Sequence, residues 1–143
     1  MSRALLDVNV LLALLDSDHV DHARAWSWLQ EQVSAAWASC AVTENGFVRV
    51  LSQPRYPSPV PPAQAVQLLA RARVEGDHEF WPCEVSLLDP TVVDPTRLHG
   101  ARQVTDAYLL ALAVARGGRL VTFDRRLSLS AVLGAGEEHL TVL

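Results

Sequence analysis

The sequence has 143 residues, half of them hydrophobic and 20% charged, which predicts a single folded domain over residues 1–143 rather than a disordered chain. Its formal net charge is −4, so the overall electrostatic field disfavours indiscriminate binding to nucleic acid, and local arrangement must decide any such binding. All 12 basic residues are arginines, which excludes every mechanism that needs a catalytic or phosphate-binding lysine.

The first third of the chain alternates short apolar runs with amphipathic segments. Arg3 to Asp7 is an apolar run closed by an acid, and a helix capped by Asn9 is expected to follow it. Further expected elements are a helix from a capping box at Asp18 to about Val33, a buried strand over 35–39 and a helix over 42–51.

The middle of the chain contains a stretch that regular structure cannot occupy. Residues 53–62 hold five of the eight prolines and predict a stiff surface connector. A helix from Pro62 to Gly76 is expected after it, and then a strand over 80–85, which Pro82 restricts to a sheet edge.

The last third repeats the alternation. The expected elements are a helix capped by Thr105 and ended by Gly117, a buried strand over 119–122, a helix near Arg125 and a final strand over 139–143. Alternating strands and helices predict an α/β fold, a three-layer α/β/α sandwich with a mainly parallel central sheet.

Four acidic residues stand where such a fold gathers its functional groups. Asp7 and Asp124 follow predicted strands, while Glu44 and Asp106 lie in the first turns of predicted helices. Because these positions share one edge of a parallel sheet, the four carboxylates are expected to meet in one cleft. Crowded carboxylates need protons or a hard cation to offset their repulsion, and an oxygen-only cluster favours Mg²⁺ or Mn²⁺ over zinc.

Four segments around these acids resemble PIN domains, and VapC-type toxins most of all. They are L-L-D-V-N-V-L-L-A-L at 5–14, T-E-N-G-F-V-R-V at 43–50, V-T-D-A-Y-L-L-A-L-A at 104–113 and V-T-F-D-R-R-L at 121–127. The resemblance extends from residue 3 to about 127, with the segments in matching order and spacing.

The resemblance implies a metal-dependent endoribonuclease that serves as the toxin of a type II toxin–antitoxin pair. The implied Mg²⁺ or Mn²⁺ ligands and catalytic residues are Asp7, Glu44, Asp106 and Asp124. Divalent ions in such sites activate water and stabilise the departing 3′ oxygen. Asn9 and Thr122 also match the family and are expected to orient a carboxylate or a bound water through hydrogen bonds.

Two pairs of residues are candidate RNA contacts. Arg55 and Tyr56 in the proline-rich connector could hold a phosphate and stack a base. Arg125 and Arg126 adjoin Asp124 and are better placed for backbone phosphates, although pairing with nearby acids is an equal alternative.

Other α/β classes are excluded or stand as alternatives. Phosphoacceptor and aspartate-nucleophile phosphatase sites need a lysine, and a dinucleotide-binding fold needs a G-x-G-x-x-G after the first strand; this chain has neither. The remaining alternative is a non-catalytic PIN-like module that binds RNA or protein.

The resemblance also implies partners. They are an RNA substrate, a small cognate antitoxin that blocks the cleft, and a second copy of the chain in a homodimer. No apolar run reaches the ~18 residues that span a bilayer, and no signal peptide follows Met1. We therefore expect a cytoplasmic protein with no membrane partner.

Overall fold

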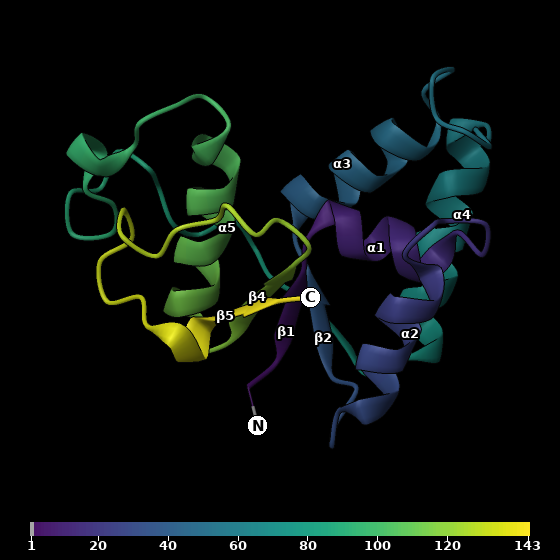
Figure 1. The fold of residues 1–143 in the computed structure, drawn as a ribbon, viewed down its shortest axis with the longest axis horizontal. Helices are drawn as coiled ribbons and strands as arrows, with labels where there is room; N and C mark the ends of the chain where they lie inside the picture. The colour runs from purple at the N-terminus through teal and green to yellow at the C-terminus, as the bar shows by residue number, and fades with distance from the viewer. Residues whose placement is uncertain (1) are drawn as a thin grey trace.

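The computed structural model describes residues 2–143 and places a parallel sheet between two layers of helices (Figure 1). The strands are β1 (Ala4–Leu6), β2 (Trp37–Ser39), β3 (His78–Phe80), β4 (Arg119–Thr122) and β5 (Leu140–Val142). The helices are α1 (Val8–Leu15), α2 (His22–Glu31), α3 (Ala41–Leu51), α4 (Pro62–Glu75) and α5 (Gln103–Ala115), with short 3₁₀ turns at Pro95–Arg97 and Glu137–His139. The predicted three-layer α/β/α class is confirmed.

The strand order β3-β2-β1-β4-β5 puts the first strand at the centre, between β2 and β4. All four strand pairs are parallel, and Leu5 of β1 pairs with Ala38 of β2 and Leu120 of β4. The carboxyl ends of β1 and β4 therefore lie side by side, and each is followed by one of the predicted site aspartates, Asp7 and Asp124.

The sheet is apolar on both faces because helices cover both. Leu6 packs into a core with α1 to α4, whereas Leu5 and Leu120 pack into a second core with α5. Figure 1 shows α5 and its flanking loops on one side of the sheet and α1 to α4 on the other. Strands covered on both faces are expected to be continuously apolar, as β1 is.

Several predicted boundaries are wrong. Helix α1 is capped by Asp7 rather than Asn9, and α2 by Asp21 rather than Asp18. Helix α5 begins at Gln103, two residues before the predicted cap at Thr105. The predicted strand over 80–85 lies earlier, at His78–Phe80, because Trp81 makes a last backbone hydrogen bond to Ser39 and Pro82 has no N–H to continue the ladder.

The helix predicted to begin near Arg125 does not form. Asp124 Oδ1 accepts the backbone N–H of Arg126 at 2.9 Å, which closes a local turn in place of a first helical turn. The segment continues through turns to an isolated antiparallel bridge between Val93 and Val132. Among residues 2–143, no helix combines the length and apolarity needed to cross a membrane.

Candidate active site

Asp7 is held rigidly at the junction of β1 and α1. Only 8% of the residue is exposed. Its Oδ1 accepts the Val8 N–H at 2.7 Å, and its Oδ2 accepts the Thr122 hydroxyl at 2.8 Å. Burial raises the pKa of the Asp7 carboxyl, the two hydrogen bonds oppose the increase, and the charge of Asp124 adds to it. Asp7 is therefore a fixed, partly desolvated carboxylate that a cation would stabilise.

The Thr122 hydroxyl connects Asp7 to the end of β4. While donating to Asp7, Thr122 Oγ1 accepts the Asn9 amide at 3.2 Å and the Asp124 backbone N–H at 3.1 Å. Asn9 Oδ1 in turn accepts the Phe123 N–H at 3.2 Å. The structure thus brings Asn9 and Thr122 into the carboxylate network for which the sequence analysis proposed them.

Asp106 and Asp124 face each other across the same edge. The pKa of Asp106 rises to about 6, first because of burial and then because of the charges of Asp7 and Asp124 and a hydrogen bond with Asp124. The pKa of Asp124 is lowered, first by the backbone N–H of Arg126. Below about pH 6 in the metal-free protein, a proton bound by this pair therefore resides on Asp106 rather than on Asp124.

Glu44 has different neighbours. Its Oε2 accepts the Ser39 hydroxyl at 2.6 Å and Arg73 Nη1 at 3.2 Å. His78 Nε2 lies 2.8 Å from the same hydroxyl oxygen, and burial followed by the Arg73 charge lowers its pKa. A neutral His78 therefore donates to Ser39, and Ser39 to Glu44. The structure gathers Asp7, Asp106 and Asp124, and it directs the Glu44 carboxylate to Arg73 on α4.

Two polar hollows adjoin the aspartates. The first, here called the α3 hollow, has a volume of about 310 Å³ and is lined by Asp7, Val8, Val42, Asn45, Gly46, Arg49, Thr105 and Leu109. The second, the loop hollow, has about 210 Å³, and its polar lining residues are Arg102, Gln103, Asp106, Asp124, Arg126 and Ser128. Asp7 thus opens into one hollow, and Asp106 and Asp124 into the other.

The sequence analysis missed the other polar residues of these hollows. Val42, Asn45, Gly46 and Arg49 recur at i, i+3, i+4 and i+7 and form one face of α3. This helical spacing was the available signal, but only the acid Glu44 was selected from the predicted helix over 42–51. Thr105, expected as a cap, instead lines the α3 hollow beside Asp7.

The candidate RNA contacts lie at different distances from the aspartates. Arg126 Nε is 3.4 Å from Asp124 Oδ1 and lines the loop hollow, while Arg125 is exposed beside it. The Tyr56 hydroxyl donates to Asp16 Oδ2 at 2.5 Å. Asp16 follows the last turn of α1 and Asp7 precedes the first, so Tyr56 contacts the end of α1 that lies about 13 Å along the helix from Asp7.

Comparison with known proteins decides the family. The model of the PIN domain matches residues 4–132. The chain belongs to the PIN-domain family. It is 64% identical over 141 residues to "Ribonuclease VapC44" of Mycobacterium tuberculosis, and this alignment covers 99% of each chain. It is 48% identical over 122 residues to "Ribonuclease VapC38" of the same species, and this alignment covers 85% of this chain and 84% of the other. The predicted resemblance to VapC-type PIN domains is confirmed.

A solved structure supports the fold of this PIN domain. A chain from the crystal structure of VapBC2 from Rickettsia felis bound to a promoter DNA fragment superposes with a TM-score of 0.53 at 12% identity. The match covers 86% of this chain and 88% of that chain. At this identity the comparison supports the shared fold alone.

The chemistry of the donor atoms fits a hard divalent cation. Asp7, Asp106 and Asp124 offer only carboxylate oxygens, and burial, together with the charges of neighbouring carboxylates, raises the pKa values of Asp7 and Asp106. Within residues 2–143, no three His, Cys, Asp or Glu side chains are already close enough together to hold an ion. The fit of this PIN domain to Mg²⁺ or Mn²⁺ therefore rests on donor type and charge.

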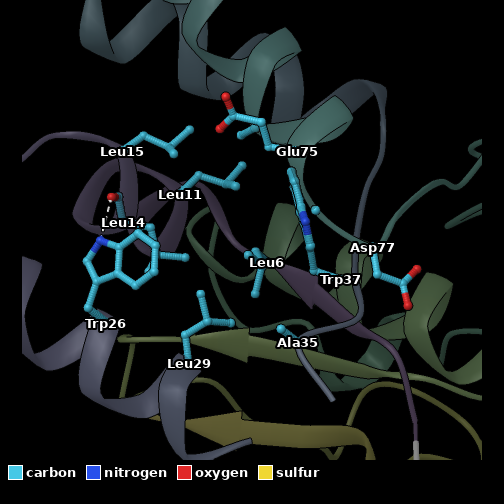
Figure 2. A pocket seen from close by; sticks show the side chains of 12 residues that line it. Leu6, Leu11, Leu14, Leu15, Trp26, Leu29, Ala35, Trp37, Glu75 and Asp77 are labelled. Atoms are coloured by element: carbon cyan, nitrogen blue, oxygen red, sulfur yellow. Dashed lines mark hydrogen bonds between the residues drawn. The ribbon is translucent and has the colours of Figure 1, made fainter.

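An apolar hollow of about 360 Å³ is lined by residues of α1, α2 and the end of α4, and by none of Asp7, Asp106 and Asp124 (Figure 2). Leu14, Trp26 and Leu29 contribute to its lining, and the Trp26 indole N–H donates to the Leu14 carbonyl at 3.0 Å. Its acidic lining residues are Glu75 and Asp77, and Asp77 is paired with Arg3 at 3.1 Å. The lining suits binding of an apolar group rather than acid–base chemistry.

Proposed function

We propose that this PIN domain is an endoribonuclease that hydrolyses RNA phosphodiester bonds and acts as the toxin of a toxin–antitoxin pair. The observation that carries the proposal is the convergence of Asp7, Asp106 and Asp124 from β1, α5 and the end of β4. The names of the relatives, ribonucleases that match the chain at up to 64% identity, support the same activity. No observation favours the non-catalytic alternative.

Asp7, Asp106 and Asp124 would hold Mg²⁺ or Mn²⁺. When bound, the metal supplies Lewis-acid activation of water and stabilisation of the departing 3′ oxygen. Thr122 and the Val8 N–H fix both oxygens of Asp7, so the carboxylate needs little reorganisation. Asp106 would hold the metal as an ionised carboxylate, so metal binding should weaken as the pH falls below about 6.

Glu44 is the fourth predicted ligand, and its carboxylate oxygen is already engaged. Oε2 is bound by Ser39 and Arg73, and the Glu44 charge is absent from the causes that shift the pKa values of the three aspartates. We assign Glu44 to the border of the site, where Ser39 and Arg73 fix its position.

The antitoxin and homodimer remain parts of this proposal. The solved VapBC2 structure is a complex by its title, which supports an antitoxin partner for this chain. The apolar hollow suits an apolar side chain of that antitoxin, and the acidic groups of Glu75 and Asp77 suit basic residues beside it (Figure 2).

The test is RNA cleavage by the purified protein and by Asp106→Asn, in Mg²⁺, in Mn²⁺ and in chelator, with mapping of the new 5′ ends. We expect cleavage by the wild type in either metal and none in chelator or with Asp106→Asn. Asp18→Asn is the matched control, since Asp18 is exposed and outside both polar hollows. RNA binding without cleavage in every condition would refute the assignment.

A further inference from the structure

Half of the 12 arginines, all within residues 2–143, already have an acidic partner. Ion pairs of 4.0 Å or less engage Arg3, Arg24, Arg73, Arg97, Arg116 and Arg126. Within residues 2–143, Arg49 and Arg102 make no such pair, and both are exposed. Each nevertheless lines one of the two polar hollows that contain the aspartates. Among the residues that the structure describes, Arg55, Arg71, Arg119 and Arg125 also lack an acidic partner, but none of them lines either hollow. Arg49 and Arg102 are therefore the unpaired cations that an anion entering the hollows would meet.

Arg49 lies beside Asp7 because α3 packs unusually closely on α1. A Cβ built on Gly46 would come within 2.6 Å of Val8 Cγ2, so only glycine lets this face of α3 approach the first turn of α1. The same face carries Asn45 and Arg49 into the α3 hollow. The guanidinium and the amide are both donors, which suits phosphate and ribose oxygens.

Arg102 occupies the corresponding place in the loop hollow. It directly precedes α5 and lines the hollow together with Gln103, Asp106 and Asp124. Arg126 is the other cation of this hollow, but it already contacts Asp124. Arg102 is therefore the arginine of the loop hollow that remains available to an external anion.

We propose that one single-stranded RNA crosses the aspartates from the α3 hollow to the loop hollow, with Arg49 and Arg102 binding the phosphates on opposite sides of the scissile bond. This inference rests on the proposed ribonuclease function and adds the course of the substrate. Asp7 is only 8% exposed, so the strand must enter the hollows to bring a phosphate to it. An unpaired strand can bend into two adjacent hollows, whereas a base-paired helix keeps its phosphates on a stiff outer surface.

The electrostatic balance supports this course. Three carboxylates repel a polyanion, and divalent cations held by them would offset this repulsion most strongly at the scissile phosphate. Neighbouring phosphates need their own counter-charges, and arginine binds phosphate through two parallel N–H donors. Arg49 and Arg102 place such a charge on each side of the aspartates.

The first test measures binding of a short fluorescent single-stranded RNA by anisotropy in chelator, in an Asp106→Asn background that leaves the RNA intact. We expect Arg49→Gln and Arg102→Gln each to weaken binding about 3- to 10-fold and to reduce the slope of log K against log salt by about 0.7. Arg49→Lys should recover part of the loss. Arg71→Gln is the matched control, because Arg71 is exposed on α4 outside both hollows.

The second test separates phosphate binding from a structural role. A dinucleoside monophosphate has only the scissile phosphate, so its cleavage by otherwise wild-type protein should be insensitive to Arg49→Gln and Arg102→Gln. Cleavage of a longer RNA should show a raised KM. Equal effects on both substrates, or binding indistinguishable from that of Arg71→Gln, would overturn the proposed course. RNA binding that depends on both arginines without wild-type cleavage would uphold the course and refute the ribonuclease proposal.

Discussion

The pKa of the Asp106 carboxyl group reflects how closely the carboxylates are crowded in the site. Its pKa is about 6, against a usual value of 3.8, through burial and the charges of Asp7 and Asp124. The folded protein therefore binds this proton more tightly than the unfolded chain. The stabilisation that protonated Asp106 gives to the folded state is therefore fully present below about pH 4 and is lost as the pH rises to about 6.

The first prediction concerns this pH window. Two pKa units correspond to about 2.7 kcal/mol, and solvent screening of the partly exposed side chain lowers the expected loss to about 1 kcal/mol. In chelator, Asp106→Asn should remove this loss, so the variant gains stability relative to wild type between pH 4 and pH 6. Urea denaturation at both pH values measures the difference, and a constant difference would contradict the assigned pKa.

A second prediction compares Asp106 with Glu44. Asp106 faces two other aspartates, whereas Glu44 is bound by Ser39 and Arg73. We expect Asp106→Asn to reduce kcat/KM at least about a hundredfold and Glu44→Gln only about tenfold. Cleavage rates in saturating Mg²⁺ test this order. Equal losses would mean that Glu44 leaves Arg73 to join the aspartates.

The close contact of α3 with α1 positions one side of the site. Gly46 has Val8 Cγ2 within 2.6 Å of where a Cβ would lie, and Val8 follows Asp7 directly. The β-branched Val8 side chain has little rotational freedom in a helix. A side chain at position 46 must therefore displace one helix from the other, together with the residues that line the α3 hollow.

A third prediction follows from this contact. Gly46→Ala should lower the free energy of unfolding by about 1–3 kcal/mol, because the clash outweighs the better helix propensity of alanine. It should also lower RNA cleavage, since Asp7 and Arg49 move apart. Gly100→Ala is the control, with nothing within 4 Å of its Cβ. Denaturation of the two variants gives the comparison, and equal stability would show that Val8 yields without strain.

Element boundaries were predictable only where local signals decide them. Strand β4 was predicted with its observed bounds because Leu120 and Val121 form a short apolar pair between the Gly117-Gly118 helix stop and the turn at Asp124. The start of α5 was missed because Gln103 Oε1 accepts the N–H groups of His99 and Gly100, at 2.6 and 3.1 Å. A glutamine that closes the preceding turn is not a familiar capping signal, so Thr105 took that role in the sequence analysis.

The site was predictable to a similar degree. The end of each strand and the start of each helix can be read from the chain, which was enough to select Asp7, Asp106 and Asp124. The partner of a charge in space cannot be read in this way. Nothing in the sequence distinguishes Glu44, paired with Arg73, from the aspartates, or Arg49, without an acidic partner, from the paired arginines.

For the whole molecule, a bound cation should act as a stabilising ligand. Binding to the folded state alone adds about 2.7 kcal/mol at a concentration of 100 times Kd, which raises Tm by roughly 5–10 °C for a domain of this size. We expect saturable stabilisation by Mg²⁺ or Mn²⁺ in thermal melts of wild type and a much smaller one in Asp106→Asn. Asp18→Asn should respond like wild type. A cation response that Asp106→Asn retains in full would place the ions elsewhere.

The hydrogen bond from Thr122 to Asp7 joins residues 115 positions apart. A ribosome must therefore synthesise most of the chain before Asp7 meets Thr122 and Asp124. Until β4 has been made and inserted beside β1, Asp7 has neither the hydrogen bond from Thr122 nor the neighbouring charge of Asp124. Translation itself therefore delays assembly of the carboxylate cluster until more than 120 residues have been synthesised.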